Sequence, residues 1–235
     1  MGRRSLFAIT LTLAYCSIVY ELALAQSMAA LLGNTFLRYN VTIGLYLAAL
    51  GAGAWLAGRA SQAGALAGLV QVEWALSILG AAGPVALSLW DLAVFRASQA
   101  GGFAFRGPVY QGLIYAFDHG LIVAIGVLSG FELPWLMRLG GEAEAEAVLA
   151  VDYAGTLAGA LAFPLLLFPV LGLPAAAAST GLLNAVCGLV LLSRARRPRG
   201  LRYAAYAGAV ALCAALLLAR APVNRLVSGG VLLLP

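Results

Sequence analysis

Charged residues are scarce in this sequence, and lysine is absent. Charged residues make up 10% of the 235 positions, and all 14 basic residues are arginine. So low a charge content excludes an ordinary water-soluble domain. Hydrophobic residues instead make up 63% of the chain, and its mean hydropathy is +0.97. The composition therefore indicates an integral membrane protein.

The sequence is also poor in residues that build metal sites and disulfides. Its three cysteines, Cys16, Cys187 and Cys213, lie in separate apolar segments and share no C-x-x-C spacing, so neither a disulfide nor a zinc site is indicated. The single histidine, His119, follows Asp118, and one such pair is too little for a metal site or a triad. We interpret it as a pair lining a helix or loop, and we expect no catalytic residue, metal or cofactor.

Seven apolar runs follow one another along the chain, each long enough to cross roughly 30 Å of hydrocarbon as a helix. They lie near residues 5–32, 42–58, 67–90, 109–131, 148–171, 174–193 and 203–219. We therefore predict an all-α integral membrane helical bundle of about seven transmembrane helices over residues 1–219, with a short C-terminal tail over 220–235. Because the second and last runs are short, six spans with one interfacial segment is the alternative.

The arginines predict the orientation of the bundle. Five of them crowd one short loop: Arg194, Arg196, Arg197, Arg199 and Arg202. Four more fall on the same side: Arg3, Arg4, Arg59 and Arg138. By the positive-inside rule we expect a multi-pass protein of a prokaryotic inner membrane, its cell membrane, with the N-terminus in the cytoplasm. The net charge of +5 then reflects topology in a lipid bilayer, and we expect no nucleic-acid partner.

Besides Asp118, four carboxylates lie inside or directly after these apolar runs: Glu21, Glu73, Glu132 and Asp152. A charged side chain near the bilayer centre costs roughly 2.5–3.5 kcal/mol unless it faces protein, water or a partner. These acids are therefore the first candidates for function. Glu73 lies near the start of its run, and we interpret it as pairing with Arg59 or snorkelling to the interface.

Helical periodicity predicts which way two of the acids point. Ser17, Glu21 and Met28 share one helical face, so Glu21 should look into the bundle, with Tyr20 beside it as a hydrogen-bond donor. Asp152 should likewise point inward, because a G-x-x-x-G pair follows it on nearly the same face.

Small residues predict where helices pack closely. Gly155 and Gly159 form the G-x-x-x-G pair of the fifth run, and Gly44 begins a stripe with Ala48 and Ala52 in the second. Small residues at this spacing let two backbones approach in a bilayer. We expect both stripes to lie at helix contacts.

Proline marks a break beside Glu132. Pro134 has no N–H, so the carbonyl of Gly130 is left free. Three further prolines follow along the fifth run and its exit: Pro164, Pro169 and Pro174. Broken helices with carboxylates nearby build cation sites at membrane depth. The alternative is that Glu132 sits at the interface close to Arg138.

An ordered set of short motifs resembles the membrane domain of the transmembrane spermidine synthase-like proteins. The motifs are Tyr20-Glu21, Gly44-Leu45-Tyr46-Leu47, Gly130-Phe131-Glu132-Leu133-Pro134 and Val151-Asp152-Tyr153-Ala154-Gly155. In that family a soluble Rossmann-like domain, which binds decarboxylated S-adenosylmethionine, follows the membrane helices and would carry aminopropyl transfer. The present sequence stops at Pro235 without the glycine-rich turn of such a domain. We therefore expect either a free-standing membrane part or a piece of a longer protein, with no aminopropyl transfer by itself.

The leading hypothesis is a non-catalytic membrane module that anchors or regulates a soluble synthase-like chain. It would bind a small cation or polyamine through a set of inward residues: Glu21, Glu132, Asp152, Tyr20 and Tyr153. Carboxylates suit this ligand because ammonium groups seek acceptors in a low-dielectric site.

Two alternatives remain open. One is a small-molecule or cation transporter, to which a loose similarity of residues 58–64 to a loop of major facilitator proteins points; a single bundle would then pair with a second copy as a homo-oligomer. The other is an intramembrane enzyme that uses two inward acids as acid and base.

Overall fold

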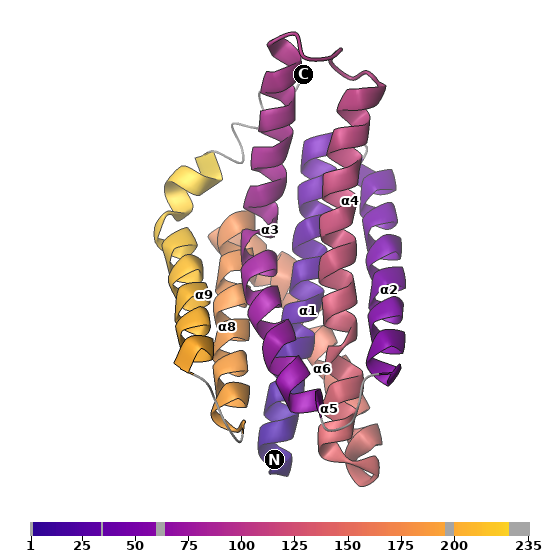
Figure 1. The fold of residues 1–235 in the computed structure, drawn as a ribbon, viewed down its shortest axis with the longest axis vertical. Helices are drawn as coiled ribbons and strands as arrows, with labels where there is room; N and C mark the ends of the chain where they lie inside the picture. The colour runs from indigo at the N-terminus through magenta and orange to yellow at the C-terminus, as the bar shows by residue number, and fades with distance from the viewer. Residues whose placement is uncertain (1, 34, 60–63, 196–199, 226–235) are drawn as a thin grey trace.

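The computed structural model describes residues 2–33, 35–59, 64–195 and 200–225, and it is helical throughout these ranges apart from turns. The helices follow the order α1 (Arg3–Leu32), α2 (Thr35–Arg59), α3 (Ala65–Gln99), α4 (Pro108–Gly130), α5 (Glu132–Gly140), η2 (Glu142–Glu144), α6 (Ala145–Ala162), η3 (Phe163–Leu167), α7 (Phe168–Leu171), α8 (Leu173–Ser193) and α9 (Gly200–Leu218). Figure 1 shows them as one elongated bundle. The all-α prediction is confirmed.

Seven helical segments in the described part of the chain are long and apolar enough to cross a membrane. Each matches one of the predicted apolar runs, and α4 with α5 counts as one segment, as does the stretch from Glu142 to Leu171. The two short runs lie in α2, with 25 residues, and α9, with 19. By length and composition, therefore, the prediction of about seven helices able to span a membrane is confirmed.

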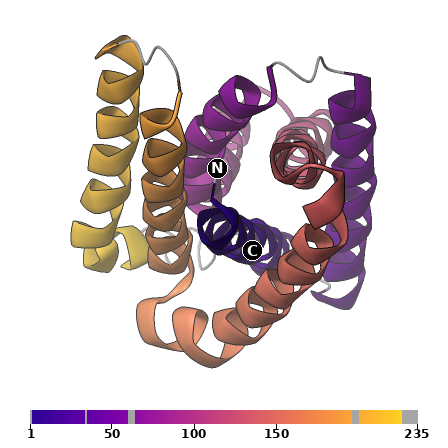
Figure 2. The same ribbon diagram turned by 90° about the horizontal axis from the view of Figure 1, so that it is seen from below.

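Helix α1 forms the centre of the bundle. Its side chains are apolar on all sides, which is typical of a helix enclosed by others rather than one with a single buried stripe. Leu13, Val19 and Ala25 are fully buried although they point in directions about 120° apart around the helix. Figure 2 shows α1 surrounded by α2, α3, α6 and α8, and all four contact it.

The contact between α1 and α6 depends on the G-x-x-x-G pair. A methyl group at Gly155 would overlap the carbonyl of Leu11, and one at Gly159 would come within 2.7 Å of the carbonyl oxygen of Tyr15. The two backbones are therefore close enough that only glycine fits, as expected for small-residue packing in membranes.

The contact between α2 and α4 uses other glycines than the sequence suggested. A methyl group at Gly53 would overlap the carbonyl of Val127, and one at Gly130 would overlap that of Leu50. Gly44 has open space around it, and Ala48 and Ala52 on its stripe are exposed. Among the described residues, then, the predicted Gly44 stripe makes no close helix contact, because α2 turns a different face to α4.

The prolines coincide with breaks in two spans. Helix α4 ends at Gly130 and α5 begins at Glu132, so Pro134 falls in the first turn of the new helix. Pro164 lies in η3, a five-residue π-helical segment, which is a common way for a helix to absorb an irregularity. Gly172 then turns the chain into α8 with a φ of 78°, a conformation that glycine adopts readily.

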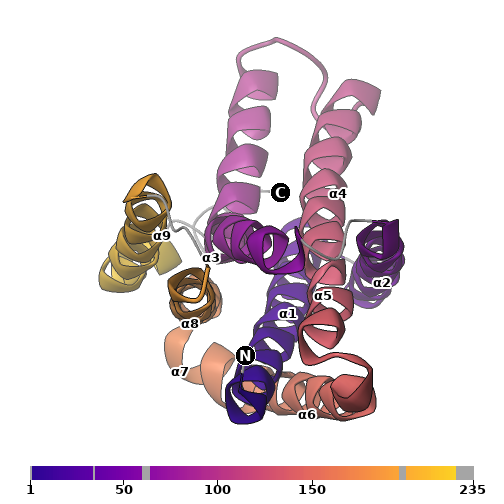
Figure 3. The same cartoon turned by 60° about the horizontal axis from the view of Figure 1, so that its bottom comes forward.

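Helices α3 and α4 extend beyond the others as a hairpin, which Figure 3 shows clearly. Helix α3 continues to Gln99 rather than ending near residue 90. Its last turns are stabilised by an apolar cluster of Val94, Tyr110 and Ile114 at the base of the hairpin loop. The helix therefore extends beyond its apolar run, because tertiary packing stabilises its more polar last turns.

The N-terminus and several predicted cytoplasmic arginines lie at the opposite end of the bundle. Arg194 donates from Nη2 to the Ser5 hydroxyl at 3.1 Å, and Arg3 pairs with Glu144 at 3.0 Å. Three arginines of the predicted cluster lie outside the described residues: Arg196, Arg197 and Arg199. The predicted tail begins with a helical turn over residues 220–225, and residues 226–235 lie outside the described part.

Candidate functional site

A cavity of about 400 Å³ lies among α1, α2, α4, α5 and α6. Three carboxylates line it: Glu21 from α1, Glu132 from α5 and Asp152 from α6. We call it the acidic cavity. Its volume is in the range of small-molecule sites, roughly 300–1,000 Å³. The tertiary structure thus brings together three acids that are 20 to more than 100 positions apart along the chain.

The candidate residues differ in depth. Glu21 and Glu132 are each 5% exposed, Asp152 is partly buried, and Tyr153 is 66% exposed at the edge of the cavity. Tyr20 does not line the cavity. It is fully buried on another face of α1, where its ring packs against Gly80 of α3. Its hydroxyl has no hydrogen-bond partner in the part of the chain that the structure describes. Adjacent helical positions are about 100° apart, so Tyr20 and Glu21 face different neighbours.

The break between α4 and α5 positions Glu132. Phe131 separates the two helices, and Glu132 is the first residue of α5. On the α4 side of the break, Ser129 and Gly130 also line the cavity. The side chain of Glu132 is buried against the cavity. Arg138 donates a hydrogen bond to the Gly58 carbonyl at 3.0 Å. The position of Glu132 relative to the membrane interface stays a prediction.

A hydroxyl network holds the wall of the cavity. The Tyr46 hydroxyl lies 2.9 Å from the Ser129 hydroxyl and 3.1 Å from both the hydroxyl and the carbonyl oxygen of Ser17. It thus joins α1, α2 and α4 at one buried point beside the acids. Sequence reasoning gave Tyr46 no role, although a tyrosine within an apolar run needs a partner for its hydroxyl.

Basic groups do not compensate the acids in the cavity. Its lining, which consists wholly of described residues, contains no arginine or histidine. The arginine closest along α2, Arg59, places its guanidinium 3.3 Å from the centre of the Trp55 ring. The cavity is accordingly an acidic environment enclosed by apolar helices.

Glu73 lies deeper than expected. It is fully buried, and neither carboxylate oxygen has a hydrogen-bond partner in the described structure. Asn184 of α8 donates to its backbone carbonyl at 3.1 Å. The interpretation that Glu73 snorkels or pairs with Arg59 is therefore wrong, because α3 turns this side chain into the bundle. Glu73 lies within electrostatic range of Glu132, which in turn interacts with Asp152.

Two further buried acids, Asp91 of α3 and Asp118 of α4, are not among the site residues predicted from the sequence. They are 1% and 0% exposed, and their carboxylate oxygens have no partners within the described ranges. Asp91 falls just after the predicted end of the third run. Asp118 had been interpreted together with His119, but His119 directs Nδ1 to the carbonyl oxygen of Tyr115 at 2.9 Å. The signal was the same as for the other acids, a carboxylate in a helix otherwise suited to lipid.

The three cysteines form no disulfide bond with one another. Cys16, Cys187 and Cys213 are free thiols. Among the described residues, no three histidine, cysteine, aspartate or glutamate side chains are grouped closely enough to hold one metal ion. The acids of the cavity are therefore spread along its walls rather than focused on one point.

Comparison with known proteins adds a chemical context. The chain is 35% identical over 228 residues to polyamine aminopropyltransferase 2 of Streptomyces coelicolor, covering 91% of this chain and 39% of that protein. It is 37% identical over 199 residues to polyamine aminopropyltransferase of Mycobacterium tuberculosis, covering 80% and 35%. For polyamine aminopropyltransferase 2 of Ralstonia nicotianae the identity is 32% over 196 residues, covering 81% and 34%.

No protein-family model and no solved structure matches the chain. The chain spans little more than a third of the length of the curated relatives described above. Most of this helical, membrane-like chain is thus similar to one part of proteins named polyamine aminopropyltransferase.

Proposed function

We propose that this chain is a non-catalytic multi-pass membrane module that binds a polyamine or small organic cation in the acidic cavity and anchors or regulates a soluble synthase-like partner. The observation that carries the ligand is the lining of the cavity, which has three carboxylates and no basic side chain. The names of the relatives support polyamines as the class of cation.

Electrostatics favours such a ligand. Attraction between an ammonium and a carboxylate is several-fold stronger in a protein interior than in water, because the effective dielectric constant is lower. Carboxylates at membrane depth are costly unless a partner compensates them. A ligand with two or more ammonium groups matches acids spread over α1, α5 and α6 better than a single metal ion does.

Aromatic and hydroxyl groups complete the proposed site. Tyr153 at the edge offers a ring face and a hydroxyl, and Ser17, Ser129 and Thr156 line the walls. Alkyl segments between the ammonium groups would contact Ile18, Leu50 and the other apolar lining residues. A polyamine alternates ammonium groups with alkyl segments, so it complements the acids and the apolar surface of the cavity.

The orientation that we propose places the N-terminus in the cytoplasm. It is supported by the positive-inside rule and by the arginines that gather at the end of the bundle where α1 begins. In this proposal residues 1–219 are the membrane unit, and a soluble partner would dock on the cytoplasmic or C-terminal side.

The test is spermidine binding to the chain reconstituted in lipid nanodiscs, measured by calorimetry. Asp152→Asn and Glu132→Gln should each weaken binding about tenfold or more, since a charge-assisted hydrogen bond contributes roughly 1.5–3 kcal/mol. Glu146→Gln is the matched control, because Glu146 belongs to the first turn of α6 and does not line the cavity. Equal binding by Asp152→Asn and the unmodified chain would remove this acid from the proposal.

The partner is tested by native mass spectrometry of nanodiscs prepared directly from the source membrane. A co-purifying soluble synthase-like chain would support the anchoring role, and a bare monomer or homodimer would contradict it.

The break between α4 and α5 beside a carboxylate-lined cavity favours transport as a second candidate. The loop residues 60–63, on which the similarity to major facilitator proteins partly rested, lie outside the described structure. Saturable spermidine uptake into proteoliposomes that disappears in Asp152→Asn would establish this function; binding without uptake would exclude it.

A further inference from the structure

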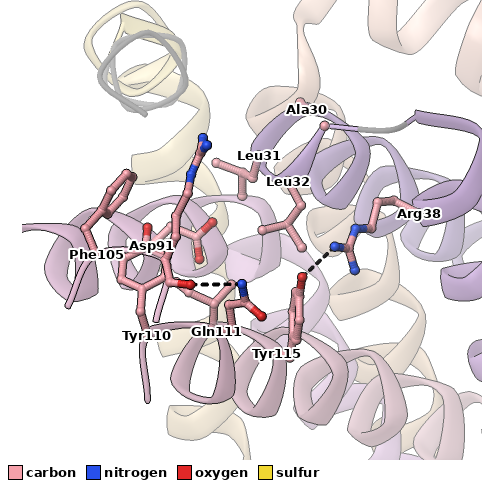
Figure 4. A pocket seen from close by; sticks show the side chains of 12 residues that line it. Ala30, Leu31, Leu32, Arg38, Asp91, Phe105, Tyr110, Gln111 and Tyr115 are labelled. Atoms are coloured by element: carbon pink, nitrogen blue, oxygen red, sulfur yellow. Dashed lines mark hydrogen bonds between the residues drawn. The ribbon is translucent and has the colours of Figure 1, made fainter. Parts of the chain in front are cut away.

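A second cavity, of about 510 Å³, lies at the other end of the bundle, where the α3–α4 hairpin meets the end of α1 and the start of α2. Figure 4 shows it from close by. Its polar lining includes Asp91, Arg38, Arg106, Gln111 and two tyrosines. We call it the hairpin cavity. None of its lining residues belongs to the acidic cavity.

Among the lining residues, Asp91 gives the clearest indication of a ligand. It lines the hairpin cavity, its side chain is 1% exposed, and neither of its carboxylate oxygens has a hydrogen-bond partner in the described structure. A buried carboxylate without a partner is unfavourable. A ligand that donates hydrogen bonds from a cationic nitrogen would compensate it.

The opposite side of the cavity is cationic. Figure 4 shows Arg38 across the cavity from Asp91, with Leu32 between them. Arg38 donates from Nη2 to the Tyr115 hydroxyl at 2.6 Å and stacks over that ring at 4.7 Å, while its buried Nε has no partner. Tyr115 therefore holds the guanidinium in place and leaves one of its donors for a ligand acceptor.

A second arginine reaches the cavity from the hairpin loop. Arg106 has a φ of 58°, an uncommon backbone conformation for a residue with a side chain. Its carbonyl accepts a hydrogen bond from Gln111 Nε2 at 3.0 Å, which secures the loop at the start of α4. Two guanidiniums thus line the site with Asp91. A simple cation is disfavoured there by the arginines, and a simple anion by the aspartate.

We propose that the hairpin cavity binds a small zwitterionic solute of the amino-acid type. Its ammonium group would meet Asp91, and its carboxylate would accept hydrogen bonds from the guanidinium of Arg38. Asp118, which is fully buried on α4 and interacts electrostatically with Arg38 and Asp91, adds a second carboxylate near the site.

The test uses the chain in lipid nanodiscs and two zwitterionic probes of different length, leucine and 6-aminohexanoate. Each is compared by calorimetry with its single-charge analogues: 3-methylbutylamine and 4-methylpentanoate for leucine, and hexylamine and hexanoate for 6-aminohexanoate. At least one zwitterion should bind tenfold or more tightly than both of its analogues.

Variants assign the binding to the cavity. Asp91→Asn and Arg38→Gln should each weaken zwitterion binding tenfold or more, and Tyr115→Phe should weaken it several-fold by loosening Arg38. Asp152→Asn is the control and should leave it unchanged, because Asp152 lines the acidic cavity instead. Asp91→Asn removes a buried, unpartnered charge, so it should fold; Arg38→Gln is the independent second variant.

Three results would overturn the proposal. An amine that binds as tightly as the zwitterion would make the cavity a cation site, and a carboxylate that does so would make it an anion site. Absence of binding by both zwitterions would mean that Asp91 and the arginines compensate one another without a ligand.

Discussion

The two cavities of this bundle use the same kind of buried acid in opposite settings. In the acidic cavity Glu21, Glu132 and Asp152 line the walls with no arginine or histidine beside them in the lining. In the hairpin cavity Asp91 shares the lining with Arg38 and Arg106. A carboxylate within an apolar helix therefore indicates a site, and the other charges around it determine the class of ligand.

The helices explain why the two settings differ. The acidic cavity forms where a span breaks between Gly130 and Glu132, so a carboxylate is placed at the start of a short helix. The hairpin cavity forms where α3 and α4 continue past the other helices and carry more polar residues with them. One site is built by interrupting a helix, the other by extending one.

The largest effect should come from removing two acids from the acidic cavity together. The double variant Glu132→Gln/Asp152→Asn should weaken spermidine binding about 100-fold or more, because each lost charged contact is worth roughly 1.5–3 kcal/mol. Calorimetry in nanodiscs measures this. Zwitterion binding in the hairpin cavity should be unaffected in the same variant, and parallel loss of both ligands would show that the two sites are not independent.

A cation introduced into the acidic cavity should make it resemble the hairpin cavity. Thr156 lines the cavity next to Asp152 on α6, and Thr156→Lys should lower spermidine affinity roughly tenfold by competing for the acids. Thr156→Met adds a similar length without charge and is the control. If both variants bind equally weakly, steric filling rather than charge explains the loss.

The wall between α1 and α6 should be sensitive to a single methyl group. Gly159→Ala should lower the free energy of unfolding by about 1–3 kcal/mol, because the added carbon meets the Tyr15 carbonyl. Gly44→Ala is matched in chemistry but lies in open space, so it should be neutral or slightly stabilising. Thermal unfolding in detergent compares the two, and an equal decrease in melting temperature would contradict the close α1–α6 contact.

The hydroxyl network should contribute less. Tyr46→Phe removes the contacts to Ser17 and Ser129, and we expect about 0.5–1.5 kcal/mol of lost stability with a several-fold loss of spermidine affinity. Unfolding and calorimetry on one preparation measure both. A change in stability alone would assign Tyr46 to packing rather than to the site.

The smallest effect on stability and binding should come from Tyr20→Phe, in contrast to Tyr46→Phe. The Tyr20 hydroxyl is buried without a partner, so Tyr20→Phe should change stability by less than about 0.5 kcal/mol, or increase it slightly. Spermidine binding should stay the same, since Tyr20 does not line the acidic cavity. Weaker binding in this variant would support the prediction that Tyr20 belongs to the ligand site.

The sequence was most informative where a residue conflicts with its surroundings. Glu21, Glu132 and Asp152 were selected because lipid cannot hold them, and all three line one cavity. It was least informative about neighbours one position apart, as with Tyr20, and about the direction of a helix face that is apolar all round, as with Gly44. Asp91 was missed because the apolar run ended before the helix did.

The sequence alone determined the all-α class, the seven apolar helices and the breaks at proline, because these follow from length, hydropathy and a missing backbone donor. Only the tertiary structure decided that Glu73 and Asp91 turn inward, that Tyr46 joins three helices, and that the acids fall into two separate cavities. The physical reason is that periodicity defines faces within one helix, whereas the rotation of each helix against its neighbours is set by close packing between them.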